Sequence, residues 1–194
     1  MTDNLAAVLD QVRACRVCEL SLPQGCRPVI RAEASARLLV IGQAPGTKVH
    51  ASGVPWDDAS GVRLRQWLNL TPEVFYDTRQ VAIMPMGFCY PGRGKSGDLP
   101  PRPECAPLWH SAVRELLPNI ELTLLIGSYA QQYYLPKDRF TLTQRVQQWR
   151  DYLPEFLPLV HPSPRNQLWL KRNPWFEGEV VGHLQRRVAE VLER

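Results

Sequence analysis

The stretch "RLLVIGQAPG", residues 37–46, is the part of the chain that decides the fold. Residues 38–41 form a continuous apolar run, which is typical of a strand buried on both faces of a parallel sheet. The run breaks directly into glycine and proline, which indicates a tight turn at its carboxyl end. The sequence therefore predicts a central buried strand that ends in a glycine turn at residues 42–46.

Three further apolar runs occur along the chain, and segments with helical spacing separate them. The runs lie within residues 80–91, 120–130 and 156–160, and the helical segments within 3–14, 59–69, 107–117, 128–135 and 174–194. This alternation is typical of the α/β class and predicts a three-layer αβα architecture around a central four-stranded, mostly parallel sheet. Without internal repeats or a low-complexity linker, residues 1–194 are expected to fold as a single domain.

Polar and glycine-rich segments come directly after each predicted strand. In open α/β sheets ligands bind at the carboxyl ends of the strands, so residues 42–46, 86–90, 127–129 and 161–166 should surround one cleft. His161 ends the last strand and opens a proline-stiffened loop. A lone histidine is more often structural, but its place at this edge favours a role in the cleft.

The charge of the chain points only weakly to a partner. A net charge of +4 and a pI near 8.9 favour an anionic ligand, and the basic side chains of the loops suit contacts to phosphates. No apolar run approaches the roughly 18 residues of a membrane span, and the N-terminus is too acidic and polar for a signal peptide. We therefore expect a cytoplasmic protein that does not associate with a membrane.

Five cysteines are unlikely to be a disulfide framework in such a protein. Cys15 and Cys18 form a CxxC pair, and fifteen residues separate Cys89 from Cys105. Four thiolates can hold a zinc ion or an iron–sulfur cluster, although the second pair has no standard zinc-ribbon spacing. The pattern alone leaves a metal site and unrelated thiols equally open, and it gives Cys26 no role.

Taken together, these segments resemble the uracil-DNA glycosylase superfamily, most closely its iron–sulfur family 4 enzymes, over nearly the whole chain. Residues 42–46, Gly-Gln-Ala-Pro-Gly, are similar to the first motif of the family. The segment "SGVPWDDASG", residues 52–61, is similar to one whose phenylalanine stacks on the flipped base, and Trp56 takes that place. His161-Pro162-Ser163 matches the second motif, whose histidine contacts the base.

The same resemblance extends to the cysteines. It implies that four of them hold a structural [4Fe–4S] cluster, with zinc as the less favoured alternative: Cys15, Cys18, Cys89 and Cys105.

The resemblance implies a monofunctional DNA glycosylase that hydrolyses the N-glycosidic bond of uracil, or of a related damaged base, in base excision repair. His161 would stabilise the departing base, and Gln43 would orient the water, with Asp57 or Asp58 as a base unless these acids merely cap the next helix. The implied substrate-binding residues are Gly42, Ala44, Pro45, Gly46, Trp56 and Ser163. The implied DNA-binding residues are Arg165, Asn166, Leu168, Lys171, Arg172 and Lys95, with Leu168 or Arg165 as a wedge. The expected partner is DNA containing a damaged base, bound by a monomer.

Two departures from the family leave the substrate open. The family reads the pyrimidine edge with an asparagine about four residues before its third cysteine, whereas this chain has Met84, Pro85 and Met86 there. Family 4 also has glutamate where this chain has Gln43. A glycosylase for another lesion, such as hypoxanthine or an oxidised pyrimidine, and a non-catalytic nucleic-acid-binding module are therefore alternatives.

Overall fold

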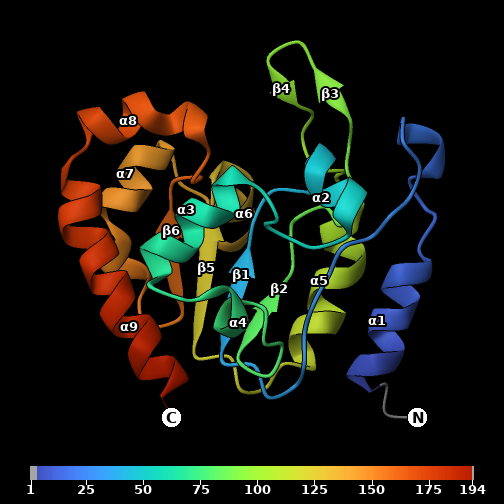
Figure 1. Ribbon diagram of the computed structural model, residues 1–194, viewed down its shortest axis with the longest axis horizontal. Coiled ribbons are helices and arrows are strands. Elements are labelled where there is room, and N and C mark those ends of the chain that lie inside the picture. The colour runs from blue at the N-terminus through green and yellow to red at the C-terminus, as the bar shows by residue number, and fades with distance from the viewer. Residues whose placement is uncertain (1–3, 194) are drawn as a thin grey trace.

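A four-stranded parallel sheet forms the centre of the computed structural model, which describes residues 4–193. Its strands lie in the order β2-β1-β5-β6, and all three pairs of neighbours run parallel. The strands are β2 (Val81–Ile83), β1 (Leu38–Ile41), β5 (Leu122–Ile126) and β6 (Phe156–Leu159). Helices cover both faces of the sheet (Figure 1), so the predicted αβα architecture is confirmed.

Two apolar clusters bury the two faces. Successive side chains of a strand point to opposite faces, so Leu38 and Val40 join one cluster and Leu39 and Ile41 the other. The first cluster includes side chains of α3 (Ala59–Leu68), α7 (Leu142–Gln147), α8 (Gln167–Arg172) and α9 (Gly182–Leu192). The second includes side chains of α1 (Leu5–Ala14), α5 (Cys105–Glu115) and α6 (Ser128–Tyr134). Burial on both faces explains why the strands read as unbroken apolar runs.

Short elements complete the fold. They are η1 (Glu19–Ser21), α2 (Thr47–Ser52), α4 (Pro72–Phe75), β3 (Arg93–Gly94), β4 (Gly97–Asp98), η2 (Trp149–Tyr152), η3 (Pro164–Asn166) and the π-helical η4 (Phe176–Val181). β3 and β4 pair as an antiparallel hairpin, which the sequence did not predict. The expected closing helix, residues 174–194, is found as η4 followed by α9, and residue 194 lies outside the described residues.

The second strand is shorter than the run at 80–91 suggests, because the chain leaves the sheet after Ile83. Pro85 has no N–H to give to a ladder, and the next two amides bond to the glycine turn instead. Met86 N donates to Gly42 O at 2.9 Å, and Gly87 N donates to Gln43 O at 3.0 Å. This segment therefore supports the turn at the end of β1.

The carboxyl ends of the strands meet at one end of the molecule. Helix α8, helix α2 and the β3–β4 hairpin stand around this edge (Figure 1). None of the helices in residues 4–193 is both long and apolar enough to cross a bilayer.

Candidate active site

A cavity of about 460 Å³ opens at the carboxyl edge of the sheet. This volume lies in the usual range for small-molecule sites. The glycine turn, the segment before α3, the β3–β4 hairpin and the loop after β6 contribute the lining. The lining residues are Val29, Gly42, Gln43, Ala44, Pro45, Gly46, Val49, Pro55, Trp56, Asp58, Ser60, Ile83, Pro85, Ser96, Gly97, Asp98, His161, Ser163, Arg165 and Asn166.

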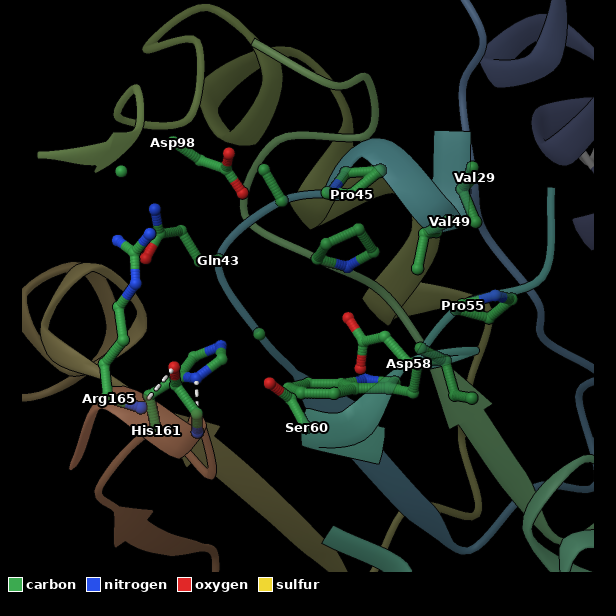
Figure 2. Close-up of a pocket in the computed structure, with 18 of the residues that line it drawn as sticks. Val29, Gln43, Pro45, Val49, Pro55, Asp58, Ser60, Asp98, His161 and Arg165 are labelled. Carbon is green, nitrogen blue, oxygen red and sulfur yellow. Dashed lines mark hydrogen bonds between the residues drawn. The ribbon is translucent and has the colours of Figure 1, made fainter. Parts of the chain in front are cut away.

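The two ends of the cavity differ in polarity. Figure 2 shows Gln43, Asp98 and Arg165 at one end. Val29, Val49 and Pro55 form an apolar wall at the other end. A ligand would therefore meet charge near the mouth and an apolar surface deeper in.

Trp56 lies against the glycine turn because residue 42 has no side chain. A Cβ at Gly42 would come within 2.7 Å of Trp56 Cζ2. The Trp56 ring also lies beside the His161 ring, with centroids 5.6 Å apart and planes inclined by 34°. The structure thus brings together the two side chains that the resemblance assigns to base contacts.

His161 is held by its own loop. Ser163 N donates to His161 Nδ1 at 3.2 Å, and Asn166 Nδ2 donates to His161 O at 2.8 Å. Because a backbone N–H can only donate, Nδ1 is an acceptor, so the neutral ring carries its proton on Nε2. Burial lowers the pKa of His161 below its usual value, although the nearby Asp58 carboxylate opposes this shift. The ring is therefore a neutral N–H donor at neutral pH.

Asp58, and not Asp57, is the acid of this segment that lines the cavity. Asp58 Oδ1 accepts a hydrogen bond from Gly61 N at 2.8 Å and caps α3. The backbone at Asp58 is extended, so neighbouring side chains point in opposite directions, and Asp57 is exposed. The structure does not bring Asp57 to the cavity. The sequence alone could not distinguish Asp57 from Asp58.

The residues expected to contact DNA fall into two groups. Arg165 and Asn166 line the cavity, and Arg165 Nη1 donates to Ser96 O at 2.8 Å, which ties the loop to the hairpin across the mouth. The others are exposed and do not line the cavity: Lys95 on the hairpin, and Leu168, Lys171 and Arg172 on α8.

His110 is a buried side chain behind the cavity to which the sequence assigns no role. Its Nε2 donates to Pro85 O at 3.0 Å, and its Nδ1 bonds to the Tyr134 hydroxyl. Burial lowers the pKa of His110 to about 4, so the ring stays neutral. His110 therefore fixes the backbone at Pro85, which lines the cavity. The sequence did hold a signal for its burial, because His110 falls on the apolar face of the helical pattern at residues 107–117.

All five cysteines line a second, small pocket, together with Pro28, Phe88 and Arg102. Every one is a free thiol. Burial raises the pKa of Cys89 to about 12 and that of Cys105 to about 11, so these thiols are neutral unless a cation stabilises their thiolates. Within residues 4–193, no three histidine, cysteine or acidic side chains gather around a point as ligands of a single ion. The donor set is nevertheless purely thiol, which fits the chemistry of an iron–sulfur cluster.

Comparisons with known proteins identify the family of this chain. The family model described as "Uracil DNA glycosylase superfamily" matches residues 30–185. A type-4 uracil-DNA glycosylase of Saccharolobus solfataricus is 26% identical over 136 residues, which cover 70% of this chain and 61% of that relative. The chain thus spans about three fifths of the length of this relative. On the extent of the family match, the chain belongs to the uracil-DNA glycosylase superfamily.

Proposed function

We propose that this chain is a monofunctional DNA glycosylase that hydrolyses the N-glycosidic bond of uracil, or of a related damaged base, in base excision repair. The observation that carries the proposal is the meeting of Trp56, His161 and the glycine turn at one cavity. A base inside a duplex is out of reach, so the nucleotide must be flipped out into this cavity.

Base contacts come first in the proposed mechanism. The face of the Trp56 ring stacks on the flipped base, and His161 Nε2–H donates to a carbonyl oxygen of that base. Negative charge develops on the base as the glycosidic bond breaks, so this hydrogen bond is strongest in the transition state. A preorganised donor of this kind contributes about 3 kcal/mol.

Water activation requires a polar group near the sugar. Gln43 lines the polar end of the cavity, and its amide can orient a water toward C1′. An oxocarbenium-like sugar is a strong electrophile, so orientation by a neutral amide suffices for attack. Asp57 does not line the cavity, so the proposal gives it no role in this step.

DNA contacts surround the mouth in the proposal. Arg165 and Asn166 grip the flipped nucleotide, and Lys95, Lys171 and Arg172 neutralise phosphates alongside it. Leu168 is 56% exposed on α8 and suits a wedge that fills the gap left by the flipped base. The partner is DNA containing a damaged base, bound by a monomer.

We also propose a structural [4Fe–4S] cluster held by Cys15, Cys18, Cys89 and Cys105, with zinc as the alternative. Iron would supply the positive charge that thiolates need in this buried pocket. Cys15 and Cys18 precede the family match but share the pocket with Cys89 and Cys105, which supports residues 1–194 acting as a single domain. Five free thiols suit a cytoplasmic location.

The test uses oligonucleotides with one uracil, as single strands and as duplexes. The protein should leave an alkali-labile abasic site, and His161→Ala should slow its formation by about 100-fold or more. His183→Ala, which alters a histidine of α9 outside the cavity, is the matched control and should keep the wild-type rate. Excision by His161→Ala at the wild-type rate would contradict the proposal. Salt-sensitive binding without any abasic product would favour the non-catalytic module.

A further inference from the structure

We infer that Asp58 reads the flipped base and distinguishes uracil and hypoxanthine from cytosine and adenine, the bases from which deamination forms them. The inference rests on the proposed glycosylase activity. It concerns the group that replaces the pyrimidine-reading asparagine, since the side chains of Met84, Pro85 and Met86 offer no strong hydrogen-bonding group.

The two oxygens of Asp58 have different surroundings. Oδ1 is used by the helix cap, where it accepts from Gly61 N at 2.8 Å. We find no protein hydrogen bond to Oδ2 within residues 4–193, and Figure 2 shows the carboxylate projecting into the cavity. The cap therefore fixes the carboxylate and leaves one acceptor for a ligand.

Position separates Asp58 from the other acid of the cavity. Asp98 is exposed on the hairpin at the mouth. Asp58 is partly buried and lies between Ser60 and the apolar wall of Val49 and Pro55 (Figure 2). A base stacked on Trp56 would thus meet His161 on one side and Asp58 on another.

Deamination changes a base in a way that a carboxylate can detect. Cytosine and adenine each have a ring nitrogen that accepts hydrogen bonds, at N3 and N1. Uracil and hypoxanthine have an N–H donor at those positions, beside a carbonyl oxygen. A carboxylate has only acceptors, so it bonds to the N–H of the deaminated base and repels the lone pair of the unmodified base. His161 and Asp58 can then read neighbouring atoms of one base, the carbonyl oxygen and the N–H.

The cap makes the substitution Asp58→Asn unusually informative. Asparagine is as good an N-cap as aspartate, so its Oδ1 stays on Gly61 N. Its Nδ2 then replaces the free acceptor with a donor, which inverts the pattern that the base meets. Single-turnover excision of uracil and hypoxanthine should fall by about 10- to 100-fold, the loss typical of a hydrogen bond to a charged group. Excision of cytosine should become detectable.

Two further variants complete the experiment, with the melting temperature of each measured to confirm folding. Asp58→Ser keeps a capping oxygen but presents no group to the base, so it should lose uracil excision without gaining activity on cytosine. Asp98→Asn removes the same charge at the mouth and should leave the preference among bases unchanged.

The outcomes separate this inference from the proposed function. If the wild-type protein releases no base from any oligonucleotide, the glycosylase proposal itself fails. If it releases uracil but not hypoxanthine, or if Asp58→Asn keeps the wild-type preference, the reading role of Asp58 is overturned. Loss of all excision in Asp58→Asn with unchanged DNA affinity and no gain on cytosine would also overturn it, because it would place Asp58 on the water.

Discussion

Trp56 occupies a left-handed backbone conformation, with φ of 59°, which is uncommon for a residue other than glycine. Tyr76 Oη donates to Pro55 O at 2.9 Å, and Arg65 Nη1 donates to Trp56 O at 3.3 Å. Such a conformation costs on the order of 1–3 kcal/mol and persists only where the surroundings hold it. The strain positions the Trp56 ring between the glycine turn and His161.

Gly61 is essential to this arrangement. A Cβ at position 61 would lie 1.7 Å from Trp56 O, so Gly61→Ala must displace the Trp56 carbonyl. We expect it to lower the free energy of unfolding by about 1–3 kcal/mol and to slow excision. Thermal unfolding and uracil release measure the two effects. Gly178→Ala is the control, because its Cβ would meet no atom within 4 Å, and equal melting temperatures for the two variants would contradict the prediction.

His161 gives a pH dependence with a definite sign. Burial lowers the pKa of His161 below the usual 6.5, so the neutral donor should persist into mildly acidic solution. The midpoint of the acidic limb of the single-turnover rate should therefore lie below pH 6.5, where protonation breaks the bond from Ser163 N. Because Asp58 opposes the shift, Asp58→Asn should move the acidic limb to still lower pH. A limb centred above 6.5 would be inconsistent with a buried neutral histidine.

Among single residues, the sequence predicted the site residues that belong to a motif. It missed those that reach a site only through tertiary contacts. His161, Trp56 and the glycine turn line the cavity, whereas residues 86–90 and 127–129, which were expected around the same cleft, do not line it. Asp58 could not be separated from Asp57, because that distinction depends on one backbone torsion. Cys26 joins the cysteine pocket only through the folding of a loop that has no local signal.

Among the elements, the strands were easier to predict than the segments that connect them. The apolar runs located β1, β2, β5 and β6, since burial on both faces leaves an unbroken pattern. Residues 84–89 looked like more of β2, but the amides of Met86 and Gly87 bond to the glycine turn instead. The hairpin has strands of only two residues, too short for any period, and part of its support comes from Arg165.

The cysteine loops give a prediction that does not depend on activity. In protein purified without oxygen, Cys15→Ser and Cys89→Ser should lose most iron and inorganic sulfide, because each removes a proposed ligand. Cys26→Ser is the matched control, since it removes a thiol from the same pocket and should keep its iron. Iron and sulfide per chain, with the visible absorbance, are the measurements. Iron loss in Cys26→Ser equal to that in Cys89→Ser would refute the ligand set, and zinc without iron would support the alternative.

For the molecule as a whole, the sequence predicted the layers but not the strand order. Alternating strands and helices imply a parallel sheet, whereas the order β2-β1-β5-β6 depends on packing between distant segments. The two apolar clusters, one on each face, record that packing. The net charge of +4 predicted even less about the binding partner, because affinity for DNA depends on where the charge lies.

The position of the basic side chains leads to a prediction about binding. Affinity for a uracil-containing oligonucleotide should fall steeply with salt, and the double variant Lys171→Ala, Arg172→Ala should lower the slope of log K against log salt by about 1.4–1.8. Arg187→Ala, on α9 and paired with Glu190, should leave the slope unchanged. Titrations at several salt concentrations measure this slope. An unchanged slope in the double variant would show that α8 does not contact the phosphates of DNA.

The backbone between Met86 and Cys89 is shared by two sites, the cavity and the cysteine pocket. On one side its amides hold the glycine turn, and only two residues beyond Gly87 the chain supplies a thiol to the cysteine pocket. A change in the backbone of the cysteine pocket should therefore also move the glycine turn, and the reverse. If the cysteines hold the proposed cluster, an oxidant that removes its iron should therefore also disturb the glycine turn of the cavity. On that proposal, we expect the glycosylase activity to fall together with the iron content.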